Sequence, residues 1–206
     1  AHLSAHARRQ RCCVLGAAPI ALRAGDPVVA RYFQEKFAAH LHRLAEADHR
    51  FVARDFYSGN FSLERGLLLE VGLFDETFAG YGNEDVDLAL RLRAAGAEMV
   101  YEPRAVALQR FDKDLVQASR DAEAKGETAL LVARKHPDAL SELRLGTYRR
   151  GSARWRVFRR IFLGVSKRSR HPANLLIRLT CLLERSRLAL PSRYYDFLFD
   201  CFFWLG

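Results

Sequence analysis

An acidic pair beside two glycines is the strongest chemical signal in this chain of 206 residues. Glu84 and Asp85 directly follow the segment Gly80-Tyr81-Gly82-Asn83. Burial raises the pKa of a carboxyl group, which lets its carboxylate take a proton from a hydroxyl group near neutral pH. The pair therefore predicts general base catalysis, with Asp85 as the base and Glu84 beside it. The alternative is a core helix whose first turn simply carries acids.

The residues that follow predict the element that would position this pair. From Glu84 to Ala95 the apolar spacing is helical, and Asn83 stands at the predicted N-cap. At about 100° per residue, Asp85 falls within about 60° of the apolar stripe. The stripe consists of Leu88, Ala89 and Leu92. Asp87 and Arg91 lie roughly opposite, so we expect them to form a solvent-facing i,i+4 pair.

Further motifs flank the pair in a compact order. They are S-G-N-x-S-x-x-R from Ser58, V-G-x-F-D-E-x-F from Val71, G-Y-G-x-E-D-x-D-L from Gly80, R-L at Arg91, a glycine at 96 and Y-x-P-x-A from Tyr101. This order resembles the acceptor-side half of inverting family-2 glycosyltransferases of the GT-A fold, over roughly residues 11–137. Related galactosyltransferases carry a similar Gly-x-Glu-Asp block.

The resemblance implies transfer of a sugar, of the hexosyltransferase type, from a nucleotide-sugar donor to an acceptor hydroxyl with inversion. It implies that Asp85 deprotonates the acceptor and that Glu84 contacts the acceptor hydroxyl or orients the loop. The residues implied to bind the sugars are Ser58, Gly59, Asn60, Gly80, Tyr81, Gly82 and Asn83. A purely structural strand-to-helix turn is the alternative for residues 58–60. Synthesis of a cell-surface polysaccharide or glycolipid is the expected setting.

The resemblance also implies a divalent cation, Mn²⁺ or Mg²⁺, that steadies the leaving diphosphate. Related enzymes carry a metal-binding histidine where this sequence has Gln109, and glutamine is a poor ligand beside imidazole or carboxylate. Arg110 could instead hold diphosphate oxygens, or it could be an ordinary surface arginine. No residue of this sequence is assigned as a metal ligand.

The expected fold is α/β, a partial GT-A mixed sheet with flanking helices in residues 1–142, followed by a basic helical region in residues 143–206. We expect strands at 11–16 and 61–63, helices at 28–47, 64–71 and 112–137, and two extended segments, 98–102 and 105–110, split by Pro103. Gly126 in the last helix suggests a close helix crossing. No Asp-x-Asp precedes the Ser58 loop, so we expect the donor-binding half to be missing or supplied by a partner chain.

The C-terminal region is basic and amphipathic. Between Leu143 and Leu183 it contains eleven Lys or Arg residues and no acid, against a net charge of +9 for the whole chain. Aromatic and aliphatic residues recur at helical spacing among the arginines, which predicts that residues 149–170 bind an anionic membrane surface. No membrane span is predicted. Nucleic acid ranks behind the membrane as a partner, because no DNA- or RNA-binding motif is present.

The four cysteines show no C-x-x-C spacing, which favours reduced thiols in the cytoplasm. We therefore expect a peripheral protein at the inner face of the membrane. Two other classes stay open. One is a non-catalytic remnant or partner subunit that binds another chain through an exposed sheet edge. The other is a membrane- or nucleic-acid-binding module built on the basic region.

Overall fold

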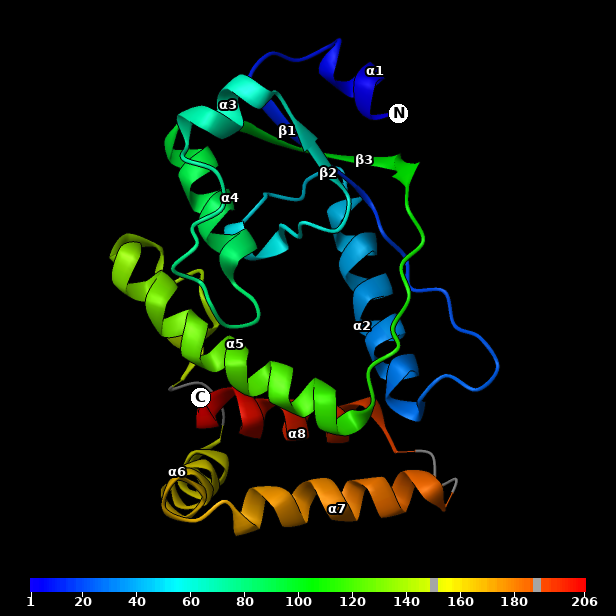
Figure 1. Cartoon of the computed structure of the whole chain (residues 1–206), viewed down its shortest axis with the longest axis vertical. Coiled ribbons are helices and arrows are strands. Elements are labelled where there is room, and N and C mark those ends of the chain that lie inside the picture. The colour runs from blue at the N-terminus through cyan, green and yellow to red at the C-terminus, as the bar shows by residue number, and fades with distance from the viewer. Residues whose placement is uncertain (149–151, 187–189) are drawn as a thin grey trace.

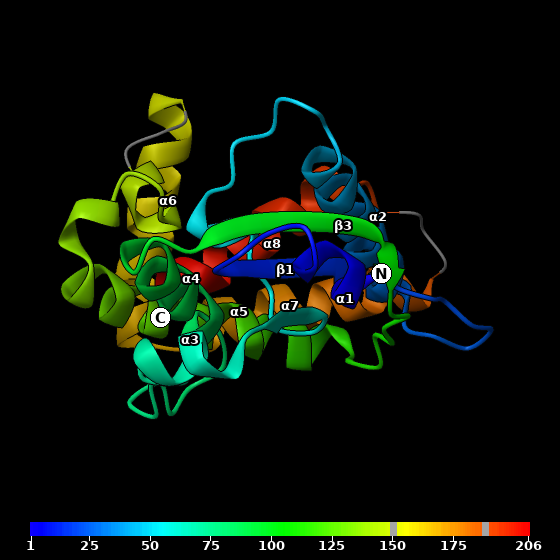
Figure 2. The same ribbon diagram turned by 90° about the horizontal axis from the view of Figure 1, so that it is seen from above.

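The computed structural model describes residues 1–148, 152–186 and 190–206 and has an α/β architecture (Figure 1). Its mixed sheet has the strand order β2-β1-β3. The central strand β1 (Cys12–Ala17) pairs antiparallel with β2 (Phe61–Leu63) and parallel with β3 (Glu98–Val106). β1 and β3 lie side by side when the molecule is seen from above (Figure 2). The α/β class is thus confirmed, whereas the GT-A assignment stays a prediction.

The helices surround this sheet and extend away from it. They are α1 (His2–His6), α2 (Val28–Leu44), α3 (Arg65–Glu70), α4 (Glu84–Ala94), α5 (Leu115–Lys135), α6 (Ala153–Arg168), α7 (His171–Arg185) and α8 (Ser192–Leu205). Short 3₁₀ turns lie at Ala53–Asp55, Pro137–Ala139 and Arg144–Thr147. The helices and strands predicted up to residue 97 are confirmed to within three residues, because each has clear periodicity and a local stop signal. One such signal is Gly72, whose φ is +86° just beyond α3.

The prediction of two extended segments split by Pro103 is wrong, because β3 runs through the proline. In the β1–β3 pairing Gly16 is opposite Glu102, whereas Ala17 is already opposite Val106, so residues 103–105 form a bulge. β3 is an edge strand, and a bulge on an edge strand tolerates a residue without an N–H group.

One hydrophobic core lies between the sheet and α4. Leu15 of β1 and Leu88 and Leu92 of α4 are fully buried in it. Val132 of α5 reaches the same core from the other side. α4 is therefore enclosed on two faces, and its buried residues extend beyond the single predicted stripe.

A second core joins the C-terminal helices to α2 and α5. It contains Val29 of α2, Leu115 of α5, Leu163 of α6 and Phe202 of α8. Figure 1 shows α8 between α5 and α7. The predicted division at residue 142 stays a prediction, but residues on both sides of it share this core.

α5 and α8 cross closely at Gly126, as the sequence predicted. A Cβ atom placed on Gly126 would lie 2.0 Å from the carbonyl oxygen of Phe203. The missing side chain therefore sets how near α8 can pack to α5.

Candidate active site

The loop before α4 is anchored on α5, which comes some forty residues later in the chain. Gly82 and Asn83 both have left-handed backbones, with φ of +89° and +69°. A Cβ on Gly82 would lie 2.6 Å from the side chain of Lys125, so glycine is required for both conformation and space. Gly80 is also tight, since its Cβ would be 3.2 Å from the Thr128 methyl group.

Asn83 occupies the predicted N-cap position, but its side chain does not cap α4. Its Nδ2 donates 2.8 Å hydrogen bonds to the carbonyl oxygen of Lys125 and to Oγ1 of Thr128. The left-handed backbone turns this side chain towards α5 and away from the free N–H groups of α4. The predicted cap is therefore corrected to a tether between two helices.

Asp85 is partly buried at the start of α4, and its Oδ1 accepts a 2.8 Å hydrogen bond from the backbone N–H of Val86. Burial is the largest cause that raises the pKa of Asp85, to about 6, and the charge of Glu84 adds to it. Lys125 acts in the opposite direction. A carboxyl group with this pKa is largely ionised at pH 7 and can still hold a transferred proton.

Glu84 contributes a second carboxylate at the same turn. Its Oε2 is buried and has no hydrogen-bond partner among the described residues. A buried acceptor without a donor is uncommon in proteins.

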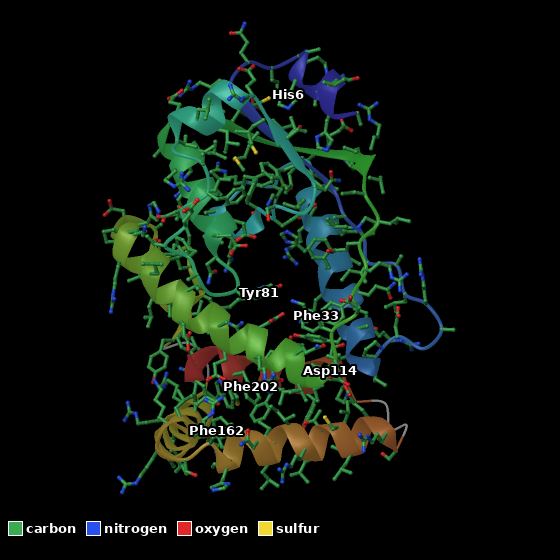
Figure 3. The ribbon with its side chains drawn as sticks, viewed as in Figure 1. His6, Phe33, Tyr81, Asp114, Phe162 and Phe202 are labelled. Atoms are coloured by element: carbon green, nitrogen blue, oxygen red, sulfur yellow. The ribbon has the colours of Figure 1, made fainter. Side chains whose placement is uncertain are left out.

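Tyr81 stands beside this pair with two lysines of the α5 segment around its ring. Lys113 Nζ lies 4.0 Å from the ring centre and Lys125 Nζ lies 5.2 Å from it. Lys113 is also paired with Asp121. Figure 3 shows Tyr81 above the middle of α5. The sequence offered no signal for either lysine, because no local pattern connects them to a loop so far upstream.

The predicted i,i+4 pair of Asp87 and Arg91 is confirmed, but its predicted exposure to solvent is wrong. Asp87 is 1% exposed, and its two oxygens accept hydrogen bonds from Arg91 Nε at 2.8 Å and from His136 Nε2 at 2.7 Å. His136 follows the end of α5, which covers the face of α4 that the helical period had assigned to solvent. Asp87 therefore links α4 to α5.

In the loop at residues 58–60, two residues are exposed and the third makes hydrogen bonds that hold the fold together. Ser58 and Gly59 are exposed. Asn60 Nδ2 donates to the carbonyl oxygens of Ala17 and Ala105, at 2.8 and 2.7 Å, and its Oδ1 pairs with His2 Nε2 at 3.0 Å. The Asn60 side chain thus ties β1, β3 and α1 together, which is the structural alternative for this position. Among the described residues no hydrogen bond or ion pair joins this loop to residues 80–85.

Gln109 and Arg110 are both used within the protein. Gln109 Nε2 donates to the carbonyl oxygen of Ala18 at 2.7 Å, and Arg110 lies 3.9 Å from the carboxylate of Asp26. In the chain as far as it is described, no three His, Cys, Asp or Glu side chains gather as a metal site. None of the described residues is therefore assigned as a metal ligand, and the proposed reaction takes no step through a metal.

Three cavities of the structure lie away from the Gly80–Asp85 loop. The largest of these three, about 660 Å³, is lined by residues of α2, α6 and α8, including Tyr32, Trp155 and Asp200.

Comparison with known proteins finds a family model that matches the part of the chain containing this loop. Residues 39–117, which include the loop and all of α4, match the model described as the N-terminal domain of galactosyltransferase. This stretch resembles a glycosyltransferase domain. The match covers less than half of the chain, and which half of a complete enzyme it represents stays a prediction.

Two curated relatives agree with a glycosyltransferase domain. The chain is 33% identical over 100 residues to validoxylamine A glucosyltransferase of Streptomyces hygroscopicus subsp. jinggangensis (strain 5008), and equally to that of subsp. limoneus. The match covers 47% of this chain but only 22% and 21% of the relatives. It thus spans about a fifth of their length. No solved structure matches the chain significantly. Together the matches show that this part of the chain is similar to glycosyltransferases.

Proposed function

We propose that this chain carries the acceptor-activating part of an inverting glycosyltransferase that uses a nucleotide-activated hexose. The observation that carries the proposal is Asp85, a carboxyl group with its pKa raised to about 6 at the start of α4, within the segment that matches the galactosyltransferase domain. The names of the family and of the relatives, which transfer galactose and glucose, support a hexose.

In the proposed step, the Asp85 carboxylate takes the proton of the acceptor hydroxyl. The acceptor oxygen forms a bond to the anomeric carbon as the bond from that carbon to the diphosphate oxygen breaks, so the configuration inverts and the nucleoside diphosphate leaves. Glu84, next to Asp85 in the chain, contacts the acceptor hydroxyl or orients the loop. General base catalysis of this kind is worth about 10²–10⁴-fold in rate.

The lysines beside Tyr81 fit the charge of such a donor. Lys113 and Lys125 lie 4.0 and 5.2 Å from the Tyr81 ring, at the same loop as the proposed base. Lys113 is already paired with Asp121, so the positive charge of Lys125 is the one that favours an anionic diphosphate in this region. The exposed residues Ser58 and Gly59 stay candidates for sugar contacts, and an acceptor on a polysaccharide or glycolipid is part of the proposal.

The proposal is tested by assaying the whole chain for sugar transfer. The donors are nucleotide-activated glucose and galactose, and the acceptors are validoxylamine A and simple glycosides. We expect a product whose anomeric configuration, measured by NMR, is inverted. Asp85→Asn should lower the rate at least 10²-fold, whereas Asp138→Asn, an exposed acid on the turn after α5, should not change it.

Two outcomes would count against the proposal. Full activity in Asp85→Asn would exclude Asp85 as the base. A product that retains the donor configuration would exclude a single displacement. If the wild-type chain transfers nothing, adding a separately expressed donor-binding half would distinguish a divided enzyme from an inactive one.

A partner subunit without catalysis is the second candidate, and the edge position of β3 favours it. Pro103 and Arg104 occupy that edge, however, and both residue types discourage pairing with another strand. A stable dimer in sedimentation velocity that breaks when Val100 is replaced by proline would support this candidate.

A further inference from the structure

α6 and α7 each present a stripe of large apolar side chains to solvent. On α6 these are Val157, Phe158, Ile161 and Val165, which are 43–61% exposed. On α7 they are Leu175, Leu179 and Leu182, which are 48–59% exposed. Spacings of three, four and seven residues place the members of each stripe on one side of their helix.

The opposite sides of both helices are buried against the rest of the molecule. Leu163 of α6 is 8% exposed and Ala173 of α7 is fully buried, and both belong to the core that contains Phe202 of α8. Figure 1 shows α6 and α7 at the end of the molecule away from the sheet. The stripes therefore face outward from this end.

Basic side chains accompany the stripes. The exposed ones that lie nearest the stripes, at about 100° per residue, are Arg154 and Arg168 on α6 and Arg178 and Arg185 on α7. The one acid of α7, Glu184, accepts a hydrogen bond from the buried Tyr195 at 2.7 Å and is itself partly buried. We call the seven apolar side chains and these four cations the basic apolar face.

We propose that the basic apolar face binds the surface of an anionic lipid bilayer, with both helices lying in the interface. The argument is complementarity, since the apolar side chains suit the boundary of the hydrocarbon and the cations suit lipid phosphates. In residues 1–148, 152–186 and 190–206 no helix meets the length and hydrophobicity needed to cross a membrane.

The composition of this face also argues against two other binding partners, a second copy of the chain and a nucleic acid. Two copies of this face would bring like charges together. A nucleic acid could stack a base on Phe158, but it offers little to the six aliphatic side chains of the face. The predicted segment 149–170 supplied only the α6 half of the face, and its residues 149–151 lie outside the described part of the chain. The leucine stripe of α7 was not predicted. Anionic lipids line the cytoplasmic leaflet, which is where this inference places the chain.

This inference goes beyond sugar transfer and does not depend on it. Its test is co-sedimentation of the chain with vesicles of phosphatidylcholine that contain either no phosphatidylserine or 30 mole per cent of it (roughly the anionic content of a cytoplasmic leaflet). We expect binding to the anionic vesicles, weakened at high salt, and little binding to neutral ones. Equal binding to both, or none to either, would overturn the proposal.

Matched variants show whether the face is responsible. Leu175→Ser, Leu179→Ser and Leu182→Ser together should weaken binding to anionic vesicles at least tenfold. The control replaces Leu3, Leu69 and Leu108, equally exposed leucines outside the C-terminal helices, by serine and should not change binding. Circular dichroism of both variants checks that they are folded. Equal loss in the two folded variants would overturn the assignment.

The charge is tested in the same way. Replacing Arg154, Arg168 and Arg178 by glutamine should weaken binding to anionic vesicles about fivefold per residue. Replacing the exposed Arg31, Arg120 and Arg134 by glutamine should weaken binding to anionic vesicles much less. Duplex DNA that displaces the chain from vesicles while binding the leucine variant equally well would favour nucleic acid instead. A dimer that the leucine variant abolishes, without vesicle binding by the wild type, would favour a second copy.

Discussion

The carboxyl group of Asp85 has a pKa of about 6 in the folded chain because it is buried beside Glu84. In the unfolded chain the same group has a pKa near 3.8. Between these two values the folded state binds more protons than the unfolded state, so this group lowers stability as the pH rises from about 4 to 6. Above that window the folded state holds a partly desolvated charge.

Asp85→Asn should therefore stabilise the protein at pH 7. We expect a gain of about 1–3 kcal/mol in the free energy of unfolding at pH 7 and almost none at pH 4. Urea unfolding of wild type and variant at the two pH values measures this difference. Asp138→Asn is the control and should show no such dependence on pH. An Asp85→Asn variant that is no more stable than wild type at pH 7 would contradict the raised pKa.

Helix packing at α5 and α8 depends on one missing side chain. In an exposed helix, Gly→Ala is favourable by about 1 kcal/mol. At Gly126 the added Cβ would meet the carbonyl oxygen of Phe203 at 2.0 Å, so the two helices must move apart. Gly126→Ala should therefore destabilise the chain by about 1–3 kcal/mol.

Gly164 on α6 provides the matched control for this prediction. Nothing lies within 4 Å of a Cβ placed there, so Gly164→Ala should stabilise the chain by up to about 1 kcal/mol. Thermal or urea unfolding of the two variants would show opposite signs. Stabilisation by both substitutions would mean that α8 does not pack closely on α5.

At the scale of the whole molecule, we expect the C-terminal helices to unfold in the same transition as the part of the chain that contains the sheet. Phe202 of α8 is 2% exposed in a core that also contains Val29 and Leu115. Phe202→Ala should lower the free energy of unfolding by about 3–5 kcal/mol, and the whole chain should still unfold in one cooperative transition, now at a lower temperature. Coincident far- and near-ultraviolet circular dichroism curves would support this. Two separate transitions, with only one moved by the substitution, would show that residues 143–206 form an independent unit.

The sequence by itself determined the local elements and some of their chemistry. Strong periodicity and clear stop signals placed β2 at residues 61–63 and predicted α4 and α5 to within a few residues of their observed bounds. These features depend on neighbours within one or two turns, which a sequence displays directly. The position of Asp85 beside Glu84 at a helix start, and with it the raised pKa, followed from the same local pattern.

Only the tertiary structure decided which surfaces meet. α5 covers the second face of α4 and buries Asp87 against His136, 49 residues away. It also brings Lys113 and Lys125 to Tyr81 and turns Asn83 into a tether. A single helical period assigns one face to the core, and it contains no information about a second helix that arrives later. Packing between distant segments therefore determined the surroundings of Asp85, the residue that the local sequence had predicted as the base.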